Sequence, residues 1–111
     1  MKRFIVFISL IFSSLYAIAQ DKDIVTEHYK VEGTCEQCEK RIAEAAYIKG
    51  VKKAKWDHDT HELTVTYRTS KTSAKEVLAA VARAGHDNEM AKATEKEYSK
   101  LPKCCKYRTV K

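Results

Sequence analysis

Two cysteines separated by two residues, Cys35 and Cys38, stand where the hydrophobic pattern of the chain changes its period. Before them, Tyr29 and Val31 alternate with polar residues, which is typical of a strand with one buried face. Gly33 breaks this alternation, and apolar residues then recur at helical spacing. The two thiols are therefore expected at the junction between a strand and the start of a helix, and this junction limits the folds that the chain can adopt.

The helix after this junction is predicted to begin near Cys38 and to end at Gly50, because glycine is common just past a helix C-terminus. Its apolar face has the spacing i, i+4, i+7 and i+8 and consists of Cys38, Ile42, Ala45 and Ala46. Thr34 and Gln37 have the spacing of a capping box, in which each side chain bonds the backbone amide of the other residue. The sequence therefore predicts a capped, amphipathic helix.

Two strands and a second helix are predicted next. The alternating apolar residues of the strands are Ala54 and Trp56, then Leu63, Val65 and Tyr67. The polar segment 57–61 between them indicates a turn. Ser73 and Glu76 form a second candidate capping box, and Gly85 is expected to end this helix. Its buried face is formed by Ala74, Val77, Leu78, Val81 and Ala82.

The order of these elements, β-α-β-β-α, predicts an α+β fold of the ferredoxin-like βαββαβ class, a sandwich completed by a short last strand around residues 88–91. We expect the domain to occupy residues 20–92. Residues 93–111 are expected to form a short tail with a helical segment and a cysteine pair. In this tail, Thr94 and Glu97 predict a capped helix that ends before Pro102.

The N-terminus is typical of a secretory signal peptide. Two basic residues open the chain, residues 4–15 are mostly apolar, and Ala17 and Ala19 have the small side chains that a signal peptidase requires. The apolar run is short for a membrane span, which needs about 20 residues. We therefore expect a signal peptide at residues 1–19, cleaved near Ala19, rather than a stable membrane anchor. The mature protein is then expected in the periplasm or outside the cell.

The charge balance argues against nucleic acid as a partner. The 111 residues have a formal net charge of +6, and residues 1–19 hold two basic and no acidic side chains, so cleavage leaves +4. The densest basic group is Lys52, Lys53 and Lys55, on the solvated face of a predicted strand. This mild positive charge is better suited to docking with an acidic protein partner than to a phosphate backbone.

Three motifs in these positions resemble the heavy-metal-associated domain family. They are Val31-Glu32-Gly33-Thr34-Cys35-Glu36-Gln37-Cys38, Gly50-Val51 and Ala84-Gly85-His86. The family includes copper chaperones, N-terminal domains of metal-pumping ATPases and the periplasmic mercury-binding protein, and the resemblance covers residues 24–91. It implies the βαββαβ fold, a metal ion held by Cys35 and Cys38, and transfer of the ion by ligand exchange. It also implies a membrane metal transporter or another metal-binding domain as partner.

One position departs from the family pattern. The family usually has methionine two residues before its first cysteine, with the side chain in the core beneath the loop, whereas this chain has Gly33. Either the loop is more flexible than in the family, or another side chain fills the space. The sequence leaves both alternatives open.

The chemistry of a thiolate pair points to soft metal ions. Thiolates select Cu(I), Zn(II) and heavier soft ions such as Hg(II) over Mg(II) and Ca(II). The free amides and dipole at a helix start favour the thiolate form, and Lys40 and Arg41 add positive charge nearby. Two thiolates suffice for Cu(I), whereas tetrahedral Zn(II) needs two further ligands. Cu(I) is therefore the expected ion, with Zn(II) and Hg(II) as further candidates.

The main alternative function is that of a thiol–disulfide oxidoreductase, because such enzymes also use two cysteines separated by two residues. They usually have an aromatic residue before the pair and often a proline inside it, whereas Glu36 and Gln37 separate the cysteines here. A structural disulfide is a third alternative. The sequence shows no Ser-His-Asp set, paired acidic site or phosphate loop, so we expect a binding protein and not an enzyme.

Three more residues are candidate auxiliary metal ligands: His86, Cys104 and Cys105. The predicted topology returns His86 to the end of the domain where the cysteine loop lies, and neutral imidazole binds Cu(I) or Zn(II). A loop histidine without a role fits that position equally well. Cys104 and Cys105 could complete a four-thiolate site, bind a second soft ion or pair with other cysteines, although a disulfide between neighbours is strained. His58 and His61 are expected at the same end as solvated turn residues.

Overall fold

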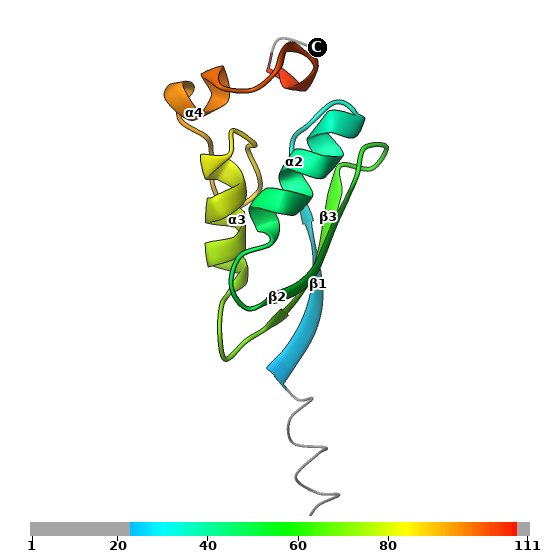
Figure 1. Cartoon of the computed structure of the whole chain (residues 1–111), viewed down its shortest axis with the longest axis vertical. Coiled ribbons are helices and arrows are strands. Elements are labelled where there is room, and N and C mark those ends of the chain that lie inside the picture. The colour runs from blue at the N-terminus through cyan, green and yellow to red at the C-terminus, as the bar shows by residue number, and fades with distance from the viewer. Residues whose placement is uncertain (1–22, 109–111) are drawn as a thin grey trace, which may run out of the picture.

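The computed structural model describes residues 23–108. In this part of the chain the strands are β1 (Ile24–Lys30), β2 (Val51–Asp57) and β3 (Glu62–Arg68), and the helices are α2 (Glu36–Ala46), α3 (Ala74–Arg83), α4 (Glu95–Ser99) and the short 3₁₀ helix η2 (Lys103–Cys105) (Figure 1). The expected signal peptide, residues 1–19, lies outside the described residues. Within residues 23–108, none of the helices has the length and apolar character needed to cross a membrane.

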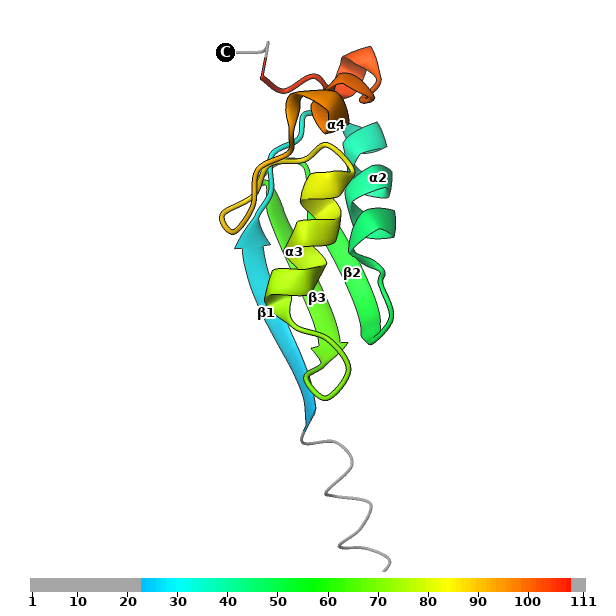
Figure 2. The same ribbon diagram turned by 90° about the vertical axis from the view of Figure 1, so that its left-hand side faces the viewer.

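The three strands form an antiparallel sheet in the order β1-β3-β2, so the last strand in sequence lies in the middle. Helices α2 and α3 cover the same face of this sheet (Figure 2). Leu63, Val65 and Tyr67 of β3 point into the core between sheet and helices, as their alternation predicts. The α+β ferredoxin-like fold class is thereby confirmed.

A fourth strand was predicted around residues 88–91. In the structure it is reduced to one antiparallel bridge between Val31 and Asn88. The side chain of Asn88 accepts hydrogen bonds from the amides of Met90 and Ala91, at 3.0 and 2.9 Å. The amide of Asn88 donates to the carbonyl of Ala91 at 2.9 Å. Asparagine often bonds the backbone a few residues ahead of it, and these bonds compete with strand pairing. The chain therefore turns away from β1 after a single bridge.

Helix α2 starts without the predicted side-chain cap. Its N-cap residue is Cys35, and the capping box of Thr34 and Gln37 is wrong. The helix ends at Ala46, earlier than predicted. Gly50 instead lies in the turn before β2, where its φ of +99° favours a residue without a Cβ.

The other two α-helices have caps close to those predicted. Ser73 accepts a hydrogen bond from the amide of Glu76 at 3.2 Å, while the Glu76 carboxylate accepts from the hydroxyl of Thr72 at 2.8 Å. The first cap is therefore half of a capping box. Thr94 and Glu97 form the complete reciprocal box at the start of α4. The box of Thr94 and Glu97 fixes the start of the tail.

Sheet, helices and tail share one hydrophobic core. Its largest fully buried members from the strands and helices include Trp56, Ile42, Leu63 and Leu78. The tail adds Tyr98, Leu101, Cys105 and Tyr107 to the same cluster. As a result, α4 and η2 are packed at the end of the domain where α2 begins (Figure 1).

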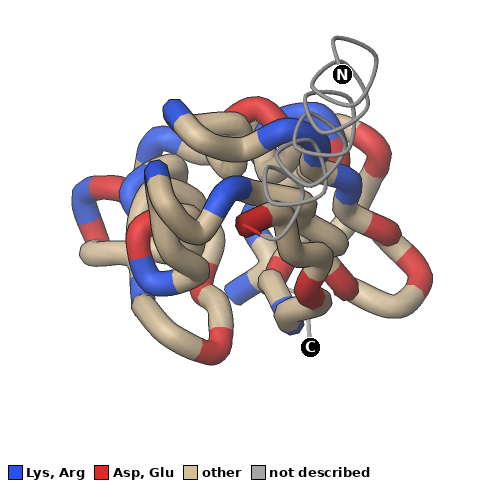
Figure 3. Tube along the Cα trace, turned by 90° about the horizontal axis from the view of Figure 1, so that it is seen from below, with Lys and Arg blue, Asp and Glu red and all other residues tan. Residues whose placement is uncertain are grey.

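Charged residues are interspersed along the trace, with basic and acidic positions close together (Figure 3). The basic group on β2 is exposed, as its place on the strand predicts: Lys52, Lys53 and Lys55. Opposite charges lie next to it along the trace, and this arrangement fits a solvated surface.

Candidate metal centre

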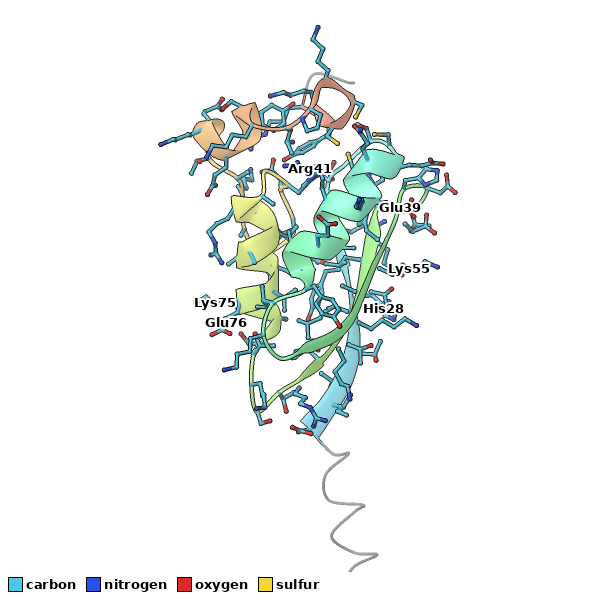
Figure 4. The ribbon with its side chains drawn as sticks, viewed as in Figure 1. His28, Glu39, Arg41, Lys55, Lys75 and Glu76 are labelled. Atoms are coloured by element: carbon cyan, nitrogen blue, oxygen red, sulfur yellow. The ribbon has the colours of Figure 1, made fainter. Side chains whose placement is uncertain are left out.

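Three sulfur atoms meet where α2 begins. The Sγ atoms of Cys35, Cys38 and Cys105 all lie within 4.8 Å of one another. Cys38 and Cys105 are buried, Cys35 is half-buried, and all of them are free thiols. Figure 4 shows sulfur atoms gathered between the start of α2 and the tail. Sequence analysis predicted the first two of these residues as a pair and Cys105 as an auxiliary candidate.

The loop between β1 and α2 fixes the first two sulfurs. The carbonyl of Cys35 accepts hydrogen bonds from the amides of Cys38 and Glu39, at 2.9 and 3.3 Å, and these bonds start the helix. Thr34 closes the loop over the second cysteine, since its amide donates to the Cys38 sulfur at 3.4 Å. The side chain of Cys38 enters the core, so the second sulfur is held by backbone and packing together.

The environment of Cys35 favours its thiolate. Burial by itself raises the pKa of this thiol. Four hydrogen bonds together outweigh burial, from the backbone amides of Cys38 and Gln37 and from the side chains of Cys104 and Thr34. The pKa of Cys35 is therefore lowered to about 7, so a large fraction of it is ionised at neutral pH.

The two tail cysteines differ from each other. Cys105 is buried, and burial together with the neighbouring thiols of Cys38 and Cys104 raises its pKa. Cys104 is exposed, and its thiol donates to the amide oxygen of Gln37. The hydrogen bond between Cys104 and Cys35, followed by burial, raises the pKa of Cys104. The structure thus places Cys105 inside the sulfur group and Cys104 at its rim, with 3.9 Å between their sulfurs.

Trp56 fills the space beneath the loop that the glycine leaves. A Cβ added to Gly33 would lie 2.9 Å from the Trp56 ring and 3.1 Å from the Cβ of Cys38. The indole is fully buried, its Nε1 donates to the carbonyl of Val31 at 3.0 Å, and its ring stacks on His61. Of the two alternatives left by the sequence, the one in which another side chain fills the space is correct.

The structure places His86 in the core and outside the sulfur group. The side chain is fully buried, its Nδ1 lies 2.7 Å from the carbonyl oxygen of Glu32, and its ring stacks on Tyr107. Its Nε2 has no hydrogen-bond partner among the described residues. Burial lowers the pKa of His86, so the neutral ring, donating from Nδ1 to the carbonyl, is the favoured form. His58 is exposed in the turn between β2 and β3, as predicted, whereas His61 is half-buried and stacks on Trp56, so the expectation of a solvated residue is wrong there.

Sequence analysis missed the residues that dock the tail. The hydroxyl of Tyr107 donates to the carbonyl of Gly85 at 2.7 Å and accepts from the amide of Asp87 at 2.8 Å. Arg108 bonds both carboxylate oxygens of Asp87, at 2.8 and 3.2 Å, and the carbonyl of Ala93 at 2.8 Å. Only their closeness to the cysteine pair marks these residues in the sequence.

Fold and thiol geometry together define a class of protein: small ferredoxin-like domains that carry a cysteine pair between the first strand and the first helix. The family model described as "Heavy-metal-associated domain" matches residues 29–87, more than half of the chain, and the protein belongs to this family. It is therefore a metal-binding domain. The tail cysteines lie outside the matched residues.

Solved structures with the same fold agree with this assignment. A protein named "CopZ metallochaperone" is 27% identical, with a TM-score of 0.55, and the match covers 58% of this chain and 98% of that one. Oxidised MerP from Ralstonia metallidurans CH34 is 26% identical, with a TM-score of 0.50, covering 59% of this chain and 96% of that one. The search of curated proteins found no significant match.

Proposed function

We propose that the protein carries or scavenges a soft metal ion, Cu(I) before Zn(II) or Hg(II), and hands it over by exchange of thiolate ligands. The observation that carries this proposal is the meeting of the Cys35 and Cys38 sulfurs within 4.8 Å at the start of α2. With metal–thiolate bonds of about 2.3 Å, two sulfurs on opposite sides of an ion lie about 4.6 Å apart. The two sulfur atoms therefore need little movement to enclose an ion.

The choice of Cu(I) follows from the number and kind of donors. Two thiolates satisfy Cu(I), while Zn(II) prefers four ligands in a tetrahedron. Cys35 is ionised in part at neutral pH, because its pKa is about 7, and so needs little further deprotonation to bind. Similarity to a metallochaperone favours a carrier over a permanent metal store.

The unequal burial of the two cysteines suits ligand exchange. Cys35 is half-buried and Cys38 is buried, so an incoming thiolate reaches the ion on the Cys35 side while Cys38 still holds it. A partner with a similar pair then takes the ion one sulfur at a time. A membrane metal transporter or another metal-binding domain has the required chemistry. The N-terminal pattern at residues 1–19 supports export, which would place the exchange in the periplasm or outside the cell.

One observation also favours the oxidoreductase alternative. A half-buried cysteine with a pKa of about 7, next to a second free thiol, is typical of dithiol enzymes as well. Reduction of insulin by the dithiol form separates the two functions. We expect no rate above that of an equal concentration of free dithiothreitol, and a faster rate that disappears in Cys35→Ser would favour the enzyme.

The test of the proposed function is native mass spectrometry of the reduced chain starting at Gln20, with Cu(I), Zn(II) and Hg(II) offered in turn. We expect one Cu(I) per chain and a loss of affinity of at least about a hundredfold in the Cys35→Ser/Cys38→Ser variant, because soft ions bind thiolate far better than hydroxyl. Circular dichroism checks that the variant is folded. Wild-type Cu(I) affinity in this variant would refute the assignment.

A further inference from the structure

We propose that Cys105 is a third thiolate ligand, brought by the C-terminal tail, which turns the cysteine pair into a three-sulfur site. This inference rests on the proposed function, because it concerns the same ion. It adds a residue that lies outside residues 29–87, where the family model matches. The ion is then enclosed from two sides, by the loop before α2 and by η2.

The distances fit trigonal coordination by sulfur. Bonds of about 2.3 Å to three thiolates in one plane place the sulfur atoms about 4 Å apart. The three Sγ atoms are already within 4.8 Å of one another, so a closure of less than an ångström brings them to that spacing. Cys35, Cys38 and Cys105 reach this arrangement from segments about 70 residues apart in sequence.

The backbone next to Cys105 is tied directly to the metal loop. The hydroxyl of Thr34 donates to the carbonyl of Cys104, and the thiol of Cys35 lies 3.4 Å from the same oxygen. The amide of Cys105 donates to the carbonyl of Pro102 at 2.9 Å and closes the single turn of η2. These contacts fix the Cys105 main chain beside the metal loop, and the complete burial of its side chain limits the positions open to the sulfur.

A set of aromatic and apolar contacts holds the tail down behind η2. Tyr98 and Tyr107 pack edge to face with 5.2 Å between ring centroids, and the guanidinium of Arg108 lies 4.4 Å from the Tyr98 ring. Leu101 is buried against Gly85, where an added Cβ would come within 2.9 Å of the leucine side chain. The tail is thus built into the domain and presents Cys105 from a defined position.

A buried free cysteine is often only a small apolar core residue. One observation separates Cys105 from that role. Its sulfur lies within 4.8 Å of two other free sulfurs at the start of a helix. The neighbouring Cys104 is exposed and turned toward Gln37, and it lies outside the three-sulfur group. Cys104 bonds Cys35 without belonging to the three-sulfur group, so its substitution separates loss of a hydrogen bond from loss of a ligand.

The site selects for ions that accept three sulfur donors. Cu(I) is stable with two or three thiolates, whereas Zn(II) requires a fourth ligand to complete its tetrahedron. When Cu(I) binds, a sulfur–copper bond forms at each cysteine, and every thiol still protonated releases its proton to solvent. The third bond slows loss of the ion, and its transfer to a partner requires the tail to release Cys105.

The test counts sulfur ligands in the reduced protein loaded with one Cu(I) per chain. X-ray absorption at the copper edge should show three sulfur neighbours in the wild type and in Cys104→Ser, and two in Cys105→Ser. Competition with a Cu(I) chelator should show at least a tenfold loss of affinity in Cys105→Ser and Cys105→Ala, and a smaller loss in Cys104→Ser, which alters only a hydrogen bond to Cys35. Circular dichroism checks the fold of each variant.

Failure of this inference and failure of the proposed function give different results. Two sulfur neighbours in the wild type, or wild-type affinity in the folded Cys105 variants, would overturn the third ligand and leave the pair standing. Should both Cys105 variants fail to fold, three sulfur neighbours in Cys104→Ser would still identify Cys105 as the third ligand, and two would overturn it. The proposed function falls instead if Cys35→Ser/Cys38→Ser keeps its Cu(I) affinity. Three sulfur neighbours in the wild type, together with the loss of affinity in Cys105→Ser, would establish the three-sulfur site.

Discussion

The two segments that meet at the sulfur group are stabilised in different ways. The loop before α2 lies between a paired strand and a helix, and its floor is the buried indole of Trp56. The tail around η2 is held mainly by polar and aromatic contacts of Tyr107 and Arg108. Opening the loop would disturb the sheet and the helices packed on it, whereas opening the tail would expose the buried side chains that it adds to the core and break the hydrogen bonds of Tyr107 and Arg108. The two halves of the sulfur group are therefore held by different kinds of contact.

The largest effect is expected from removing the floor of the loop. Trp56→Ala deletes a fully buried side chain and its hydrogen bond to the Val31 carbonyl, and such truncations cost about 3–5 kcal/mol. Urea unfolding measures the change. Tyr47→Ala, which removes an exposed aromatic side chain, is the matched control and should cost less than about 1 kcal/mol. Equal losses of stability in the two variants would contradict the role of Trp56 as the floor of the loop.

The next effect tests the glycine above that indole. Gly33→Met restores the residue that the family usually has, but its Cβ would meet the Trp56 ring at 2.9 Å, and overpacking of this kind costs about 1–3 kcal/mol. Combining it with Trp56→Leu should recover part of the loss, because the smaller side chain makes room. Urea unfolding of the two single variants and the double variant gives the coupling. Strictly additive losses would contradict a shared space.

A smaller effect is expected in the tail. Tyr107→Phe leaves the Gly85 carbonyl and the Asp87 amide without their shared partner, at a cost of about 1 kcal/mol. Because the tail can open locally, the urea midpoint should move little while hydrogen exchange around η2 becomes faster. Exchange in β3 serves as the internal control. If exchange accelerated equally in both places, tail and body would unfold as one unit and the comparison would fail.

The smallest effect separates the thiols by their reactivity. The pKa of Cys35 is lowered to about 7, so its thiolate fraction should rise through neutral pH and level off above it. The pKa of Cys104 is raised, so its thiolate should form only above its ordinary range. Since a lower pKa also reduces nucleophilicity, we expect Cys35 to be alkylated only roughly fivefold faster at pH 7. Peptide mass spectrometry after iodoacetamide treatment measures the alkylation rates of both cysteines. Faster alkylation of Cys104 would contradict the lower pKa of Cys35.

Local periodicity predicted the body of the molecule because each of its elements buries one regular face. The alternation of Leu63, Val65 and Tyr67 and the spacing of Cys38 and Ile42 depend on neighbours a few residues away, and both are found in the structure. The last strand was not predicted correctly, since the side chain of Asn88 bonds the backbone ahead of it and forms a turn. Patterns of hydrophobicity contain no information on such a competition.

Only the part of the candidate site that is close together in sequence was predictable. Cys35 and Cys38 are marked by their spacing, but the meeting with Cys105 depends on contacts across the whole chain. The capping role expected for Thr34 is a case of this kind, because its hydroxyl bonds the carbonyl of Cys104 in the tail. His86 was placed at the correct end of the domain, and its complete burial depends on Tyr107, which no periodic pattern links to it.

Trp56 is the only tryptophan in the chain, and it lies against the loop that holds the first two sulfurs. Its indole therefore dominates the ultraviolet emission of the folded protein. The emission reports on the loop and not on the tail, whose aromatic side chains are the tyrosines Tyr98 and Tyr107. Gly33 lets the ring approach the loop backbone, because an added Cβ would lie 2.9 Å from the ring. A natural fluorophore therefore lies beneath the loop that carries the thiol pair.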